Sequence, residues 1–261
     1  MQINLNADLG ESFGAYRMGD DAALMAIIGS ANVACGFHGG DPSVMASTVR
    51  LARTAGVSIG AHPSFPDLQG FGRRVMQLGA AELGAVVQYQ VGALMGLAQA
   101  QGVRVSHVKP HGAMNNMACE DAAMATTIAR AVHAMDPTLI LLAPALSQLA
   151  LAGRAVGLAV ADEVFADRAY ADDGTLLPRS QPGAVLHSTE ACVAHVLRMV
   201  AQGGIVTASG RLLATPFHSV CVHGDNAHAV ATAAAVRDSL QAAGHQLCTL
   251  PALLGQGTAG G

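Results

Sequence analysis

The chain has 261 residues, of which 51% are hydrophobic and 12% are charged. An apolar content this high excludes a disordered chain, because disordered chains are too polar to collapse. Fourteen basic and eighteen acidic residues give a formal charge of −4, which does not favour binding to nucleic acid or to an anionic membrane. A chain of this length is typical of one large domain, and α/β barrels often have this size.

The sequence carries no signal for a membrane or for export. A membrane-spanning helix needs roughly 20 consecutive apolar residues, whereas the longest apolar run, 139–146, is shorter and contains Pro144. The first residues, MQINLNADLGE, lack the basic and apolar regions of a secretory signal. The five cysteines form no CxxC pair, so neither a disulfide framework nor a thiolate zinc site is indicated. We therefore expect a soluble, cytoplasmic protein.

A pattern of three parts recurs along the chain. It consists of a β-rich run, then a turn rich in Gly, His, Asp and Pro, then a helical stretch rich in Ala, Leu and Met. The expected strands span 3–8, 32–36, 57–61, 103–109, 139–143, 157–164 and 220–223. The expected helices span 21–28, 42–55, 80–101, 120–134, 145–152, 189–202 and 227–243. A long irregular segment separates the sixth strand from its helix.

This regular alternation predicts a parallel sheet that is covered by helices. The expected strands are apolar on both faces, which favours a closed or nearly closed (β/α) barrel over an open doubly wound sheet. No repeat or change in composition divides the chain. We therefore predict a single α/β barrel domain over residues 1–261, with residues 253–261 as a flexible tail.

Ionisable residues gather where the expected strands end. They are Asp8 and Glu11, His38 and Asp41, His62 and Asp67, Lys109 and His111, Glu163, Asp167 and Arg168, and His223 and Asp225. In α/β barrels the carboxyl ends of the strands converge on one face, which carries the chemistry. Each residue alone could equally form a turn or bond to nearby backbone. Together they predict a functional site.

Lys109 is the only lysine in the chain, and all other basic side chains are arginines. It stands at a strand end beside a His-Gly turn. A lysine in this place can hold an anion, or act as an acid or base if burial lowers its pKa. The alternative is a lone surface lysine, and the position favours the functional interpretation.

Several standard motifs are missing. The lysine is followed by proline, so there is no phosphate-binding GxxxxGK[ST] loop. The sequence also lacks GxSxG, HExxH and a GxGxxG after a strand. Asp and His side chains from several strand ends could still bind a divalent metal such as zinc. Whether a metal is bound is left open.

Seven segments at the strand ends together resemble one family. They are NADLGE (6–11), CGFHGGDP (35–42), GAHPSFPD (60–67), GFGRR (70–74), VKPHGAMNN (108–116), EVFADRAY (163–170) and CVHGDN (221–226). Their order and spacing are similar to those of the LamB/YcsF lactam-utilisation family, the 5-oxoprolinase A subunits. The family commonly has Tyr in place of Phe65, and Leu-Tyr in place of Met114 and Asn115. We expect both differences to lie in loops near the site.

The resemblance implies a seven-stranded (β/α) TIM-like barrel of the glycoside hydrolase/deacetylase type. It also implies cleavage of 5-oxo-L-proline to L-glutamate, coupled to hydrolysis of ATP to ADP and phosphate, together with partner subunits B and C. ATP is then a co-substrate, with Mg²⁺ expected. Because the sequence has no P-loop, either ATP binds a surface that no motif reveals or a partner handles the phosphorylation. We favour a reaction whose steps are shared between this chain and its partner subunits.

In such a reaction Asp8 or Glu163 would orient or deprotonate water. His38, His62 and His111 would transfer protons. Lys109, Arg168 and Arg179 would hold the substrate carboxylate or a phosphate. The remaining binding candidates are Glu11, Asp41, Asp67, Asp167, His223 and Asp225.

Two other functions remain open. The first is a stand-alone, metal-dependent hydrolase of an N-acetylated sugar, with Asp8, His38 and His62 as candidate ligands; it rests on fold analogy. The second is a lactam-binding subunit whose partners hold all the chemistry. Metal retained through purification favours the hydrolase. Unchanged activity of the complex after substitution of the strand-end residues favours the lactam-binding role.

Overall fold

The computed structural model describes residues 1–223 and 227–256. Its strands are β1 (Gln2–Leu9), β2 (Ser30–Ala34), β3 (Ser58–His62), β4 (Val105–Val108), β5 (Ile140–Pro144), β6 (Ala159–Phe165), β7 (Gly204–Val206), β8 (Leu212–Ala214), β9 (Ser219–Val222) and β10 (Gln246–Leu247). Its helices are α1 (Asp21–Met25), α2 (Pro42–Ala55), α3 (Ala80–Gln99), α4 (Gly112–Glu120), α5 (Ala122–Met135), α6 (Gln148–Ala155), α7 (Thr189–Gln202), α8 (Ala227–Ala242) and α9 (Leu250–Leu253).

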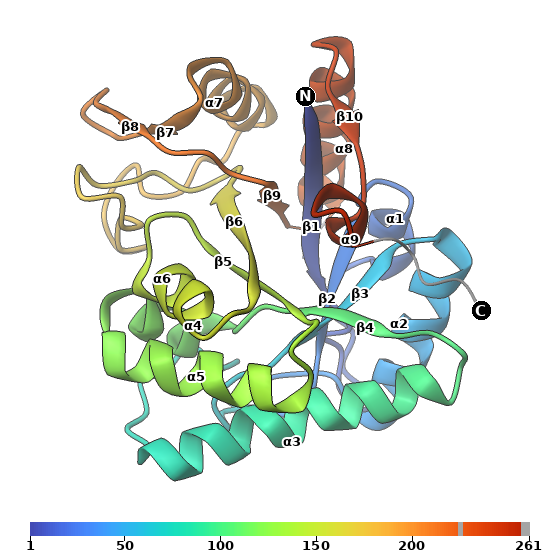
Figure 1. Cartoon of the computed structure of the whole chain (residues 1–261). Coiled ribbons are helices and arrows are strands. Elements are labelled where there is room, and N and C mark those ends of the chain that lie inside the picture. The colour runs from blue at the N-terminus through green and yellow to red at the C-terminus, as the bar shows by residue number, and fades with distance from the viewer. Residues whose placement is uncertain (224–226, 257–261) are drawn as a thin grey trace.

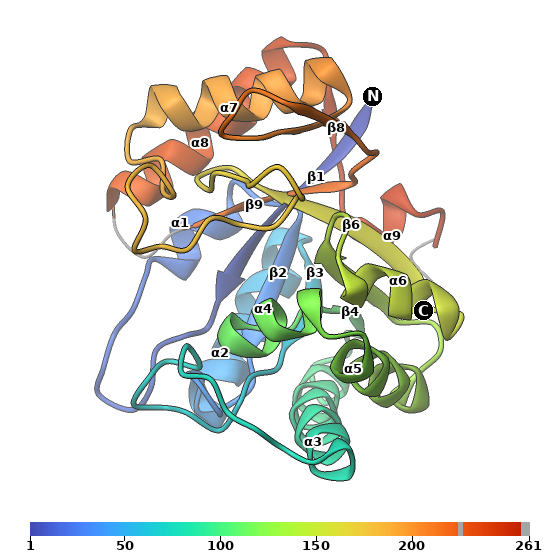
Figure 2. The same ribbon diagram turned by 90° about the vertical axis from the view of Figure 1, so that its left-hand side faces the viewer.

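Seven parallel strands close into a barrel. Their order is β1-β2-β3-β4-β5-β6-β9, and β9 pairs with both β6 and β1. Helices surround the strands, with α3, α5 and α6 packed in succession on one side (Figure 1). On another side α7 packs against α8 (Figure 2). The predicted seven-stranded (β/α) barrel is therefore confirmed.

The interior of the barrel is partly polar. Along β1 the residues Asn4, Asn6 and Asp8 alternate with apolar residues that belong to the main hydrophobic core. The side chain of Asn6 crosses the barrel to donate to Glu163 on β6, at 2.8 Å, although β9 lies between the two strands. The polar face of β1 therefore points inwards. The expectation that the strands are apolar on both faces is wrong for β1.

The carboxyl-terminal segment covers the amino-terminal end of the barrel. β10 pairs in parallel with the first residues of β1, and Gln246 lies opposite Gln2. Leu250 of α9 is fully buried in a small cluster with β5 and β6, and its N–H donates to Ser30 Oγ at 3.2 Å. Neither β10 nor α9 was predicted. Because α9 ends at Leu253 and residues 257–261 lie outside the described part, the flexible tail stays a prediction.

Two further elements differ from the sequence expectation. α4 occupies a stretch that was expected as a loop, and it buries Met114 and Asn115, so this departure from the family pattern lies in a helix rather than a loop. β7 and β8 form an antiparallel hairpin between α7 and β9. Within the described residues no helix is both long and apolar enough to span a membrane. The five cysteines are free thiols.

Gly60 of β3 leaves room for the side chain of His107 on the neighbouring strand β4. A Cβ at this position would lie 2.1 Å from His107 Nε2, far inside contact distance. His107 itself is fully buried and cannot move into solvent. The glycine is therefore required by the packing of the barrel interior.

We expect Gly60→Ala to lower the free energy of unfolding by about 1–3 kcal/mol, because it overpacks a closed interior. Gly84→Ala is the matched control: Gly84 lies inside α3, where a Cβ meets nothing within 4 Å. That variant should gain about 0.5–1 kcal/mol from helix propensity. Urea unfolding of both variants measures the difference. A Gly60→Ala variant as stable as the parent would contradict the described packing.

Candidate active site

Lys109 lies inside the barrel between two carboxylates. Its Nζ is 3.0 Å from Asp8 Oδ1 and 3.1 Å from Glu163 Oε1, and it also donates to Asn6 Oδ1 at 3.2 Å. Burial alone would lower the pKa of Lys109, but Asp8, Cys221 and Glu163 outweigh it and raise the pKa well above its usual range. The sole lysine is therefore a buried cation rather than a surface residue.

The two carboxylates differ in their access to solvent. The Asp8 side chain is 17% exposed, whereas that of Glu163 is fully buried. Burial raises the pKa of Asp8, but the charges of His62 and Lys109 outweigh burial and bring it well below the usual value. Burial raises the pKa of Glu163 in spite of Lys109. Of the two predicted groups for water activation, Asp8 is the one that water can reach.

Amide side chains from neighbouring strands hold these charges in place. Asn32 Nδ2 donates to Asp8 Oδ1 at 2.9 Å and to Asn6 Oδ1 at 2.8 Å. Asn32 Oδ1 accepts from His107 Nε2 at 3.0 Å. Neither asparagine was predicted as a site residue. The alternation Asn-x-Asn-x-Asp along β1 was the available signal, since alternate residues share one face of a strand.

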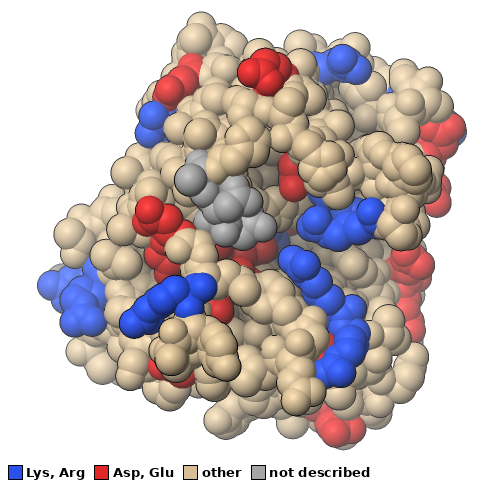
Figure 3. Space-filling view, turned by 180° about the vertical axis from the view of Figure 1, so that it is seen from behind, with Lys and Arg blue, Asp and Glu red and all other residues tan. Residues whose placement is uncertain are grey.

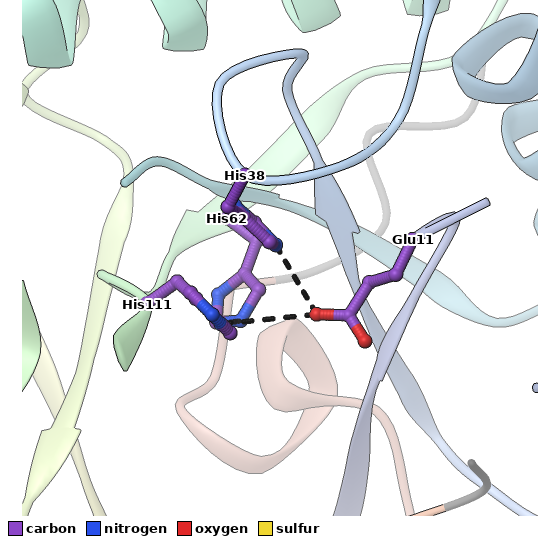
Figure 4. Close-up of side chains that lie close together, drawn as sticks. All are labelled: Glu11, His38, His62 and His111. Atoms are coloured by element: carbon purple, nitrogen blue, oxygen red, sulfur yellow. Dashed lines mark hydrogen bonds and ion pairs between the residues drawn. The ribbon is translucent and has the colours of Figure 1, made fainter. Parts of the chain in front are cut away.

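Three histidines and one carboxylate form a second cluster beside Asp8, which we call the histidine cluster: Glu11, His38, His62 and His111 (Figure 4). Glu11 Oε1 lies 3.1 Å from His38 Nε2 and 3.7 Å from His111 Nδ1. The rings of His38 and His111 stack with centroids 3.8 Å apart. Burial, reinforced by the charge of Asp8, raises the pKa of Glu11 to about 7. The structure thus brings together residues from four separate strand ends.

A glycine in the 70–74 segment lets this cluster pack. Gly72 has a φ of +66°, and a Cβ there would lie 2.2 Å from Ser64 Oγ and 2.8 Å from the ring of His111. The carbonyl of the preceding residue, Phe71, accepts a hydrogen bond from His111 Nε2 at 2.9 Å. The GFGRR segment therefore fixes the orientation of one histidine ring.

A cavity of about 300 Å³ lies on the His223 side of Asp8, and its lining includes Arg73, Asp167, Arg179 and His223. His223 Nδ1 lies 3.0 Å from Asp167 Oδ2, and one ring nitrogen of His223 lies within 4.8 Å of an Asp8 carboxylate oxygen. Figure 3 looks onto the side at which the strands end, where both basic and acidic side chains border the central region. Arg73 was not predicted as a site residue, although it belongs to the quoted GFGRR segment.

Other predicted site residues have different contacts. Asp41 caps α2 by accepting hydrogen bonds from backbone N–H groups of its first turn. Asp67 accepts from Arg74 and from backbone N–H groups of its own loop. Arg168 donates to two carbonyls of the segment between β6 and α7, at 2.6 and 3.4 Å. Asp225 lies outside the described residues. For these residues a binding role stays a prediction that no contact in the described part supports.

We expect Lys109→Met to lower the free energy of unfolding by about 3–5 kcal/mol, because it leaves two carboxylates in the barrel without their cation. The double variant Lys109→Met/Glu163→Gln should recover part of this loss, since it removes the fully buried charge as well. Urea unfolding of the parent and both variants gives the comparison. Equal losses in the single and double variants would argue against the described ion pair.

His107 also predicts a dependence of stability on pH. Burial, with Lys109 and His62 nearby, lowers its pKa from 6.5 to about 3. Below pH 6.5 the unfolded chain therefore takes up a proton that the folded chain does not, so stability falls as the pH drops from there towards 3. In His107→Gln this slope should decrease by up to about 1.4 kcal/mol per pH unit.

Urea unfolding across the mildly acidic range measures this slope. His133→Gln, at a partly exposed position on α5, is the matched control and should keep the slope of the parent. If His107→Gln keeps the slope of the parent as well, the buried histidine is not the group responsible.

Sequence comparisons agree with the strand-end motifs. Residues 3–255 match the LamB/YcsF family. A protein of Azoarcus sp. (strain BH72) that is named as the A subunit of 5-oxoprolinase is 61% identical over 251 residues, which cover 96% of this chain and 98% of the relative. The Bacillus subtilis (strain 168) protein of the same name is 50% identical over 249 residues, with 95% and 97% covered.

Structure comparisons lead to the same conclusion. The crystal structure of a lactam utilization protein from Thermus thermophilus has a TM-score of 0.91 and 43% identity, and the match covers 96% of this chain and 100% of that one. A T48 deacetylase solved with substrate has a TM-score of 0.51 at 15% identity over 97% and 92% of the two chains, which shows a shared fold alone. The chain therefore belongs to the LamB/YcsF family.

Proposed function

We propose that this chain is the A subunit of an ATP-dependent 5-oxoprolinase that opens 5-oxo-L-proline to L-glutamate. Relatives that are 50–61% identical over nearly the whole chain are named as the A subunit of 5-oxoprolinase. In this proposal partner subunits B and C complete the enzyme. Among the described residues, the observation that carries the proposal is the small cavity with basic residues, one of which, His223, lies near Asp8.

The cavity suits a small anion. Its volume of about 300 Å³ is at the lower end of the range for small-molecule sites. Asp167 in the lining pairs with His223, so Arg73 and Arg179 are the positive charges that are available for the carboxylate of 5-oxoproline. Arginine binds carboxylates and phosphates through two parallel hydrogen bonds. In this arrangement Arg179 and Arg73 hold the substrate, whereas Arg168 holds backbone.

The chemistry must make an unactivated amide electrophilic. Transfer of the γ-phosphoryl group of ATP to the amide oxygen releases ADP and activates the ring carbon. Water then adds to that carbon, the C–N bond breaks, and the ring nitrogen leaves as an amine after taking a proton. A second water hydrolyses the remaining acyl phosphate to glutamate and inorganic phosphate. Both water additions need an oriented water beside the ring carbon.

Asp8 is the side chain best placed to orient that water. Lys109 and Asn32 fix its Oδ1, and His62 Nε2 lies 3.3 Å from its Oδ2. Its low pKa keeps it ionised, so it acts as a hydrogen-bond acceptor for water. Lys109 then has a positioning role, because its ammonium group is surrounded by Asp8, Asn6 and Glu163.

The phosphorylation step is shared with the partners in this proposal. The chain has no P-loop, and its one lysine is held inside the barrel by Asp8 and Glu163 rather than in a phosphate-binding loop. A partner subunit then supplies the nucleotide site or completes it. The lactam binds in the cavity of this chain and meets the phosphoryl group there.

Release of glutamate from 5-oxoproline and Mg-ATP tests the proposal. We expect activity when this chain is mixed with subunits B and C, and none with this chain alone or with B and C alone. Within the active mixture, Arg179→Gln should raise the KM for 5-oxoproline roughly tenfold or more, as expected for loss of a charge-assisted hydrogen bond.

Arg130→Gln, at an exposed position on α5, is the matched control and should leave KM unchanged. Full activity of B and C without this chain would contradict a role for it in the reaction. An unchanged KM in Arg179→Gln would remove the cavity from substrate binding while leaving the place of this chain in the complex intact.

A further inference from the structure

We propose that the histidine cluster binds a divalent transition-metal ion, with Glu11, His38, His62 and His111 as ligands. One ligand atom of each residue lies within 4.8 Å of the other three. The three histidines are almost fully buried, and they come from the ends of three different strands. Neither the oxoprolinase reaction nor the identity of the partners is needed for this inference.

The positions of the ring protons support a metal. His62 Nδ1 lies 2.6 Å from the carbonyl oxygen of Lys109, and His111 Nε2 lies 2.9 Å from the carbonyl oxygen of Phe71. A carbonyl oxygen can only accept, so both of these ring nitrogens carry a proton. In a neutral imidazole the other nitrogen then has a lone pair and no proton.

Those two other nitrogens face each other. His62 Nε2 and His111 Nδ1 are 2.9 Å apart, a hydrogen-bond distance, although neither has a proton to donate when both rings are neutral. Two lone pairs at this distance repel each other unless a cation lies near both of them. The backbone carbonyls thus orient both rings so that these two nitrogens face each other.

Glu11 and His38 complete the set on the other side. Glu11 Oε1 is 3.1 Å from His38 Nε2 and 3.7 Å from His111 Nδ1. A tetrahedral Zn²⁺ with bonds of about 2.0–2.1 Å separates its ligand atoms by roughly 3.4 Å. Three of the distances between ligand atoms, 2.9, 3.1 and 3.7 Å, lie around this value, and all of them are within 4.8 Å.

The donor set indicates the class of metal. Three imidazoles and one carboxylate suit zinc or a similar borderline ion rather than Mg²⁺ or Ca²⁺, which prefer oxygen ligands. Metal-bound histidines usually donate their other N–H to a carbonyl or carboxylate, as His62 and His111 do here. The Nδ1 of His38 has no such partner among the described side chains and backbone. We therefore expect His38 to be the weakest of the four ligands.

A proton is the alternative occupant of this point. If His62 is an imidazolium, its Nε2–H donates to His111 Nδ1, and the charge is balanced by Asp8 at 3.3 Å. The two occupants differ in a measurable way. If a proton occupies this point, the protein has no affinity for Zn²⁺ at this site. With a metal bound, the three histidines act as ligands instead of transferring protons.

Metal titration of the chelator-treated chain distinguishes the two. Zn²⁺ is added in competition with a chromophoric chelator, and Co²⁺ is added in parallel to record the visible bands of a tetrahedral site. We expect one tight site per chain, a tetrahedral Co²⁺ spectrum, and a higher melting temperature with Zn²⁺, because the ion binds only the folded state. Glu11→Gln and His111→Gln should each weaken the binding by at least about 100-fold, since loss of even a supporting contact costs 10–100-fold.

His133→Gln on α5 is the matched control, and it should bind Zn²⁺ with the affinity of the parent. Circular dichroism of each metal-free variant confirms that it is folded, so that lost binding is not mistaken for lost structure. Absence of a tight site in the parent, or unchanged affinity in both Glu11→Gln and His111→Gln, overturns the proposal and favours the imidazolium. Oxoprolinase activity is not part of this readout, so the two proposals can fail separately.

Discussion

The barrel depends on a positive charge that is placed where water cannot solvate it. Lys109 is held between Asp8 and Glu163, and removing an ion from water costs several kcal/mol unless its partners replace the lost solvation. Asn6 adds a hydrogen bond to both the ammonium group and Glu163. Three strands, β1, β4 and β6, are thus linked through a single side chain across the interior. This linkage fixes the orientation of the Asp8 carboxylate towards the open end of the barrel.

Around Asp8 the site has two parts with different chemistry. On one side the histidine cluster offers buried nitrogen lone pairs and a carboxylate. On the other side the cavity offers arginines and His223. His62 connects Asp8 to the cluster at 3.3 Å, and His223 connects it to the cavity. The substrate of the proposed function contains both a neutral amide carbonyl and an anionic carboxylate, so a site with two chemically different parts suits it.

Local patterns predicted the strand ends, because turns with Gly, Pro and His follow each β-rich run. The structure brings three of the predicted strand-end residues, Asp8, His62 and Lys109, together. Their chemical roles stay predictions. Arg168 was harder to interpret, because its partners are carbonyls of an irregular segment that has no sequence signal. α4 was missed because glycine and asparagine are poor helix formers, so burial rather than propensity determines it. Asp41 was predicted as a binding residue, but it caps α2, and the proline that follows it was the signal for a cap that the prediction did not use.

The closure of the barrel has a consequence for biosynthesis. β1 is synthesised before the other strands, yet β9 and β10, which both pair with it, are synthesised after all the others. Contacts between such distant segments form slowly. A nascent chain that has reached β6 therefore exposes the polar face of β1 and the strand edge that later pairs with β9, until β9 has been synthesised. An open strand edge of this kind makes the emerging chain prone to aggregation.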